Sequence, residues 1–221
     1  MKASLLGLCA VLALVSTHAR ADILTDAGLA PMTSAAQPEV GVDTDALDEL
    51  DPFDPYVEKT LQMMDSIYQL ETGRSAHLPS APMSYFSGCY REACPVYVHV
   101  SRSHQLLDLY VNGVFSGQWL VSTGVPGRDT PDFDTHPDGR VYDAYTSTKF
   151  PGGDFEGLGN MPYAVFIEGG FALHGTGRSN WPKLGHRASH GCIRQHPDNA
   201  YRFNRLVRQV GAIGTWVTVE E

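Results

Sequence analysis

The chain has 221 residues, with 16 Lys and Arg against 25 Asp and Glu, so its formal net charge is −9. An acidic chain is repelled by the phosphates of nucleic acids and of anionic lipids, and we therefore expect neither as a partner. The length suits one domain with an extension.

The first 21 residues are typical of a secretory signal peptide. Lys2 supplies the positive start, the apolar stretch 5–15 is too short to cross a bilayer, and Ala19-Arg20-Ala21 is a small-x-small cleavage site. An uncleaved anchor is the alternative. Cleavage leaves 14 basic and 25 acidic residues, a net charge of −11. We therefore expect an exported protein whose mature chain has no membrane span.

Three cysteines remain after this cleavage. Cys89 and Cys94 are close enough in sequence to form a disulfide across a turn, because export leads to an oxidising compartment. Cys192 is then the odd thiol, either reactive or intermolecular. Two unpaired buried thiols at positions 89 and 94 are the alternative.

Residues 22–92 are predicted to form an N-terminal extension that is flexible and partly helical. The stretch 31–51 is rich in Ala, Pro and acidic residues without an apolar period, which favours a solvated tether over a calcium loop. Within 54–72 apolar residues recur at helical spacing, and Gly73 follows as a stop signal. We predict a helix there and a loop over 74–92.

From residue 95 onward the pattern changes to short strands. We predict strands at 96–100, 105–111, 114–122, 161–168, 170–174 and 216–219, with Asn112-Gly113 as a hairpin turn. Apolar spacing after Pro197 predicts a helix that ends at Gly211. The long segment 124–159 is rich in Gly, Pro and Asp, and we expect a substrate-side loop rather than a metal site. The pattern predicts a mainly β fold, a sandwich or barrel, with a few helices.

One stretch, 173–194, concentrates the reactive side chains around Cys192. Imidazole can take a thiol proton, and glycine beside a nucleophile leaves backbone N–H groups open to an oxyanion. A buried structural thiol and a zinc site are the alternatives, but we favour a nucleophile and expect no metal or cofactor. The spacing leaves the base open between His174 and His190. The three histidines of the stretch are His174, His186 and His190.

Two motifs in this stretch carry a family resemblance. Leu-His-Gly-Thr at 173–176 and Ser-His-Gly-Cys-Ile-Arg at 189–194 resemble the signature of the L,D-transpeptidases, the YkuD-type catalytic domain. Leu-Tyr-Val-Asn-Gly at 109–113, Val-Ser-Thr-Gly at 121–124 and Met-Pro-Tyr at 161–163 support it. The segment 132–160 departs from the family pattern. The resemblance implies a β-sandwich-like catalytic domain over 93–221, in the periplasm or cell envelope of a bacterium.

The same resemblance implies a reaction on peptidoglycan stem peptides. The thiol of Cys192 attacks the bond before a terminal D-Ala, a thioester forms, and an amine resolves it into a 3→3 cross-link or another attachment. A monomeric enzyme is expected. The alternatives are an L,D-carboxypeptidase or endopeptidase on the same fold, a zinc peptidase, and a non-catalytic wall-binding module.

The resemblance also assigns roles to single residues. His174 becomes the base, with the carbonyl of Gly175 orienting its ring. Other residues around the thiol line the nucleophile, and the N–H groups of positions 191 and 192 form the oxyanion hole. The lining residues are Ser189, His190 and Gly191, and the expected substrate contacts are Arg194, Trp181 and Thr176.

Overall fold

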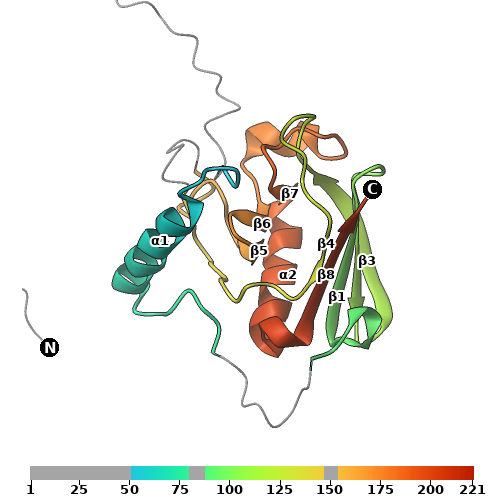
Figure 1. The fold of residues 1–221 in the computed structure, drawn as a ribbon, viewed down its shortest axis with the longest axis horizontal. Helices are drawn as coiled ribbons and strands as arrows, with labels where there is room; N and C mark the ends of the chain where they lie inside the picture. Colours follow the sequence, from blue (N-terminus) through green and yellow to red (C-terminus); the bar gives the residue numbers. More distant parts are fainter. Residues whose placement is uncertain (1–50, 80–87, 147–153) are drawn as a thin grey trace, which may run out of the picture. The chain divides into compact units, whose positions relative to one another are not determined.

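The computed structural model describes residues 51–79, 88–146 and 154–221 (Figure 1). The predicted signal peptide, the predicted tether up to residue 50 and positions 147–153 of the divergent segment lie outside the described residues. No helix in the described part of the chain is long and apolar enough to span a membrane.

Eight strands form one sheet in the order β4-β8-β1-β2-β3-β7-β6-β5. The expected mainly β fold with a few helices is confirmed. The strands are β1 (Val96–Ser101), β2 (Leu106–Val111), β3 (Val114–Ser122), β4 (Phe133–Thr135), β5 (Val165–Glu168), β6 (Phe171–Gly175), β7 (Ile193–Gln195) and β8 (Thr215–Glu220). The helices are α1 (Val57–Thr72) and α2 (Pro197–Val210), with short 3₁₀ turns η2 (Arg91–Ala93), η3 (Arg178–Lys183) and η4 (Ala212–Gly214).

The first strands follow the alternation of the sequence. Val98 pairs with Leu109 across the antiparallel β1–β2 ladder, and both are fully buried, whereas the neighbouring His99 is half-buried. Period-two alternation of this kind buries one face of a sheet. The β2–β3 turn has positive φ at Asn112 and at Gly113, as the predicted two-residue hairpin requires.

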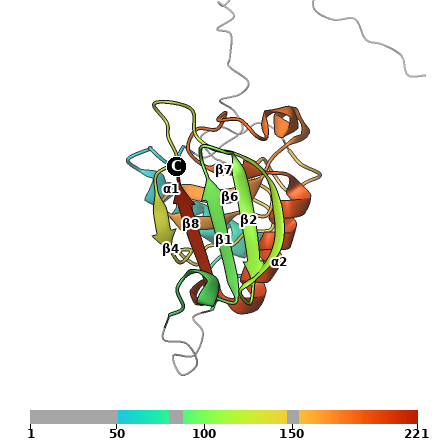
Figure 2. The ribbon, with the colours of Figure 1, turned by 90° about the vertical axis from the view of Figure 1, so that its right-hand side faces the viewer.

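The strands that carry the reactive motifs join the rest of the sheet through a short ladder. Only Val121↔Gln195 and Ser122↔Arg194 are paired between β3 and β7. Beyond β7, β6 runs parallel to it and β5 runs antiparallel to β6. Helix α2 packs against β6 (Figure 2). It buries Phe203 and Val207 in the main core.

Helix α1 packs on the same part of the molecule as the reactive motifs. Its buried face consists of Leu61, Met64 and Tyr68, and these side chains belong to one apolar cluster with Phe166 and Cys192. The extension therefore contributes directly to the core beside the thiol.

A polar network beside the apolar face also holds α1. Asp65 accepts hydrogen bonds from Tyr142 and from Arg140 Nε at 3.1 Å, and it pairs with His77 at 3.0 Å. Arg140 is buried and also reaches Glu58 at 2.6 Å. Burial alone would raise the pKa of Asp65, but the hydrogen bonds from Tyr142, His77 and Arg140 outweigh it and hold the pKa below 3.8.

Asp65→Asn is expected to lower the free energy of unfolding by about 1–3 kcal/mol, since it removes charge-assisted hydrogen bonds to a buried guanidinium. Because the folded-state pKa is lowered, this contribution is present above the unfolded value of 3.8 and is lost as the pH falls through the folded value. Urea unfolding at pH 7 and at pH 3 measures it. A difference between wild type and variant that persists unchanged at pH 3 would contradict this account.

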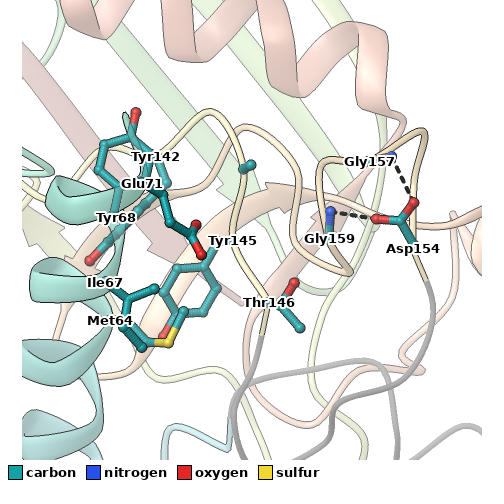
Figure 3. A pocket seen from close by; sticks show the side chains of 11 residues that line it. Met64, Ile67, Tyr68, Glu71, Tyr142, Tyr145, Thr146, Asp154, Gly157 and Gly159 are labelled. Atoms are coloured by element: carbon teal, nitrogen blue, oxygen red, sulfur yellow. Dashed lines mark hydrogen bonds between the residues drawn. The ribbon is translucent and has the colours of Figure 1, made fainter. Parts of the chain in front are cut away.

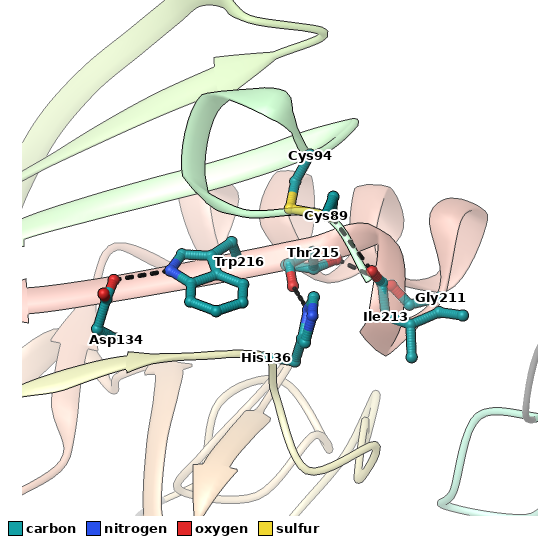
Figure 4. The surroundings of a disulfide bond; sticks show 8 residues. All are labelled: Cys89, Cys94, Asp134, His136, Gly211, Ile213, Thr215 and Trp216. Atoms are coloured by element: carbon teal, nitrogen blue, oxygen red, sulfur yellow. Dashed lines mark hydrogen bonds between the residues drawn. A yellow bond between two sulfur atoms is a disulfide. The ribbon is translucent and has the colours of Figure 1, made fainter. Parts of the chain in front are cut away.

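A disulfide joins Cys89 to Cys94 at the start of β1 (Figure 4). The turn that it closes lies against β8, where the ring of Tyr90 meets Trp216 edge-on with centroids 4.9 Å apart. The indole N–H of Trp216 donates to Asp134 of β4 at 2.8 Å. The disulfide therefore anchors the turn before the first strand to the sheet edge formed by β4 and β8.

Replacing both Cys89 and Cys94 by Ser is expected to cost about 2 kcal/mol of unfolding free energy, the loop-closure value for so short a loop. Urea unfolding of the oxidised protein and of the double variant gives the difference. Peptide mapping without reductant should find these two cysteines linked and Cys192 free. A native disulfide that contains Cys192 would contradict the assignment of the thiol.

Candidate active site

The sheet topology brings His174 and Cys192 to adjacent strands. In the parallel β6–β7 ladder Leu173 lies opposite Ile193 and His174 opposite Arg194. Cys192 immediately precedes β7 and is therefore level with the residue two positions before His174. Since side chains alternate along a strand, His174 and Cys192 share one face of the sheet and are diagonal neighbours.

A hydrogen bond to the next residue of its own strand orients the ring of His174. His174 is fully buried, and its Nδ1 lies 2.7 Å from the carbonyl oxygen of Gly175. A carbonyl oxygen only accepts hydrogen bonds, so Nδ1 carries a proton and Nε2 is the nitrogen that can accept one. This is the tautomer that a general base needs toward a thiol.

The thiol of Cys192 is not in a disulfide and is fully buried. Its Sγ donates to the carbonyl oxygen of Gly170, in the β5–β6 turn, at 3.4 Å. Apolar side chains of α1 and of the segment after Arg140 surround it in one cluster. A side chain with this burial cannot meet a substrate from solvent until part of its surroundings moves.

A compact turn precedes the thiol. Ser189 Oγ donates to the carbonyl of Cys192 at 2.5 Å and accepts the N–H of Gly191 at 3.1 Å. Thr130 Oγ1 donates to the carbonyl of Gly191 at 2.7 Å. Gly191 has φ +121°, which an L side chain rarely adopts. The turn thus fixes the backbone of the predicted oxyanion donors, and one of them, the N–H of Gly191, is engaged with Ser189.

The other predicted site residues make hydrogen bonds that hold the loop between the two motifs. Arg194 is fully buried and donates to the carbonyl of Ala188 at 2.9 Å, so it does not lie in solvent. Thr176 is also buried and accepts a hydrogen bond from Asn180 at 3.0 Å. The indole N–H of Trp181 donates to the carbonyl of Thr176 at 3.0 Å. Contact of these three residues with a substrate stays a prediction.

The remaining histidines differ in their surroundings. His190 is half-buried within the turn before Cys192, whereas His186 is exposed and its backbone N–H donates to Lys183. Over residues 51–79, 88–146 and 154–221, no three His, Cys, Asp or Glu side chains converge as a metal-binding group would.

A pocket of about 510 Å³ opens between α1 and the segments 142–146 and 154–159 (Figure 3). Met64, Tyr68 and Tyr145 line it and also belong to the apolar cluster of Cys192. The hydroxyl of Tyr145 is buried without a hydrogen-bond partner among the described residues. Burial raises the pKa of Tyr145 well above its usual value. The pocket therefore adjoins the apolar cluster that contains Cys192, on the side where α1 of the extension lies.

A second hollow of about 590 Å³ lies beside the loop of Trp181. The ring of Trp181 packs on that of His196 with centroids 4.3 Å apart, and Tyr163 and Tyr201 form the opposite wall.

The sequence interpretation missed Tyr145, Arg128 and Asp51. The first two lie in the irregular segment 124–159, where no periodic signal ranks one residue above another. Asp51 was expected in a solvated tether, but it is buried and pairs with Arg128 at 3.0 Å. An ion pair between segments that are far apart in the sequence leaves no periodic pattern. The acidic composition of the stretch therefore did not indicate this contact.

Comparisons with known proteins agree with the motifs. The YkuD family model, described as the L,D-transpeptidase catalytic domain, matches residues 95–219. No curated protein matches the chain. Similar solved structures include an L,D-transpeptidase from Mycobacterium tuberculosis, with 24% identity, a TM-score of 0.44 and coverage of 58% of each chain.

Two further solved structures show the same level of similarity. L,D-transpeptidase 3 from Mycobacterium tuberculosis, in complex with a faropenem-derived adduct, has 22% identity and a TM-score of 0.44, with 58% of this chain and 62% of that chain covered. An L,D-transpeptidase from Stackebrandtia nassauensis has 22% identity and a TM-score of 0.46, with 62% and 61% covered. The matches thus span about three fifths of these structures.

Proposed function

The chain belongs to the YkuD family of L,D-transpeptidase catalytic domains, and from this membership we propose that it is an exported cysteine acyltransferase acting on peptidoglycan stem peptides. The observation that carries the proposal is the orientation of His174. Its Nδ1–H is bound by Gly175 while β6 holds the ring on the face that Cys192 shares. Such an arrangement supports a thiol nucleophile with a general base.

In the first half of the proposed reaction, Nε2 of His174 takes the proton of the Cys192 thiol. The sulfur attacks the carbonyl carbon that precedes the terminal D-Ala of a stem peptide. As the tetrahedral adduct collapses, the C–N bond breaks, His174 returns its proton to the departing amine, and the acyl group remains on sulfur as a thioester.

In the second half, an acceptor amine attacks the thioester carbon and gives a proton to His174. The C–S bond breaks, and the thiolate regains that proton. In both halves the oxyanion faces the N–H groups of Gly191 and Cys192, of which the first has to be shared with Ser189 Oγ. If water is the acceptor, the same steps release a shortened peptide and the enzyme is a carboxypeptidase.

Incubation of the purified protein with defined muropeptides tests this proposal. Loss of D-Ala from a tetrapeptide stem, with a new mass equal to two joined stems, is the result expected for a transpeptidase. A product shortened by D-Ala without joining would identify the hydrolase. Activity that disappears in a chelator, or no product from any stem peptide, would contradict the thiol mechanism.

A second expected result concerns carbapenems, which the family resemblance implies as compatible with such sites. The thiolate should open the β-lactam ring, forming a C–S bond and breaking the C–N bond, and the acyl group should stay on Cys192 because its leaving group remains tethered. Intact-protein mass spectrometry should show one added drug mass per chain. An adduct on another residue, or one that a chelator prevents, would count against this mechanism.

A further inference from the structure

A short segment of the extension, Asp51 to Phe53, lies directly on the turns that hold the thiol. A Cβ atom added to Gly191 would be 2.7 Å from Pro52 Cγ and 3.0 Å from Phe53 Cε2. One added to Gly170 would be 2.6 Å from Pro52 Cα. Gly170 accepts the hydrogen bond of the thiol, and Gly191 precedes it. The segment therefore covers both backbone neighbours of the Cys192 side chain.

An ion pair fixes the start of this covering segment. The carboxylate of Asp51 is 6% exposed, and its Oδ2 lies 3.0 Å from Nη1 of Arg128. The other carboxylate oxygen accepts the N–H of Phe53 at 3.0 Å, so the turn itself orients the acid. A guanidinium is well suited to bind a carboxylate, whether it comes from this chain or from a ligand.

Arg128 is attached to the active-site turn through its own loop. The N–H of Val125 donates to the carbonyl of Ser189 at 3.0 Å, and Thr130 donates to the carbonyl of Gly191. The Arg128 side chain is 42% exposed, so it can be reached from solvent beside the buried acid. A cationic group is thus held at a fixed position next to the loop that carries the nucleophile.

Access to the thiol requires that some covering part moves, because Cys192 is fully buried. Helix α1 is held by the Arg140 network and by three buried apolar side chains. Residues 51–53 are held by the Arg128 ion pair and by an edge-on contact of Phe53 with Phe171, with centroids 5.4 Å apart. Displacement of this segment is therefore the smaller rearrangement.

We propose that Arg128 binds the terminal carboxylate of the peptide substrate, and that Asp51–Phe53 occupies the same position in the free enzyme as an internal competitor. The inference rests on the proposed function, whose substrate ends in a free carboxylate. The substrate carboxylate displaces that of Asp51, the segment with Pro52 lifts, and the thiol becomes reachable. Arg128 is then a specificity-determining residue for peptides with an unmodified C-terminus.

Two variants separate the roles of the ion-pair partners in the full chain. Asp51→Asn and Arg128→Gln both break the pair, and each should raise the rate of Cys192 alkylation by iodoacetamide, a small neutral reagent, by roughly fivefold, the factor expected for a partly exposed ion pair. Glu220→Gln, which breaks the exposed pair with His99 on the sheet, is the matched control and should leave the rate unchanged.

Steady-state kinetics with a stem tetrapeptide then distinguishes competitor from receptor. Asp51→Asn should lower KM, whereas Arg128→Gln should raise KM by roughly tenfold or more, the order of a lost charge-assisted contact. With the same peptide carrying a C-terminal carboxamide, Arg128→Gln should have a KM no higher than that of wild type, because the variant releases the segment and loses no carboxylate contact with that peptide. A KM that Arg128→Gln leaves unchanged, or equal alkylation rates in all four proteins, would overturn the inference.

Absence of turnover in every protein, with the alkylation differences intact, would instead contradict the proposed function and leave the covering role of the segment standing.

Discussion

Cys192→Ala is expected to reduce turnover of stem peptides to the background of the uncatalysed reaction. No other residue can form the thioester, since the two remaining cysteines of the described chain are joined in a disulfide. The fold should survive, because deleting one buried sulfur costs about 1 kcal/mol, comparable to the loss of a methyl group. Product masses and urea unfolding measure the two quantities on the same preparation.

Cys192→Ser is the matched control for this variant. It keeps nearly the same volume and the donor to Gly170, but a serine hydroxyl is a far weaker nucleophile beside a neutral imidazole. Both variants should therefore be inactive while the serine form is the more stable of the two. Retained turnover in Cys192→Ala would show that the thiol is not the nucleophile.

His174→Ala is expected to lower kcat by ~10²–10⁴-fold, the usual contribution of a positioned general base. The physical reason is that, in the proposed mechanism, the ring held through Nδ1 by Gly175 accepts the thiol proton. The pH dependence of Cys192 alkylation gives an independent measurement. In His174→Ala the rate should rise only at higher pH, because thiolate formation no longer has the imidazole to assist it.

His186→Ala and His190→Ala are the controls for this result. His186 is exposed, and its replacement should leave kcat within about twofold, the typical range for a surface position. His190 is in the turn before the thiol, so its variant tests the alternative base that the spacing left open. A larger loss at His190 than at His174 would transfer the role of base, and equal losses at all three histidines would point to shared metal ligation.

Local patterns were sufficient to predict most of the fold. The helix within 54–72, the Asn112-Gly113 hairpin and the helix from Pro197 to the residue before Gly211 are present because each depends on interactions within a few residues. Strands β4 and β7 were not predicted. Each has three residues, too few for alternation to stand out, and each exists through pairing with a distant strand.

The site was predictable only where the motif carries it. The signature predicts the thiol and the histidines as site residues, but no sequence pattern indicates the covering segment. Asp51 and Pro52 fall in a stretch predicted to be a solvated tether, and for these two residues that prediction is wrong, because both are buried against the domain. Pro52 packs on Gly170 and Gly191, which follow it in the chain by 118 and 139 positions. No local propensity reports such a contact.

A thioester on Cys192 is measured directly by the mass of the protein after brief exposure to a stem tetrapeptide without an acceptor. We expect an added mass equal to the stem tetrapeptide minus D-Ala, located on the proteolytic fragment that contains Cys192, released by an added amine and unaffected by a chelator. Turnover that proceeds with no covalent species, or an added mass on any other residue, would contradict the thioester mechanism.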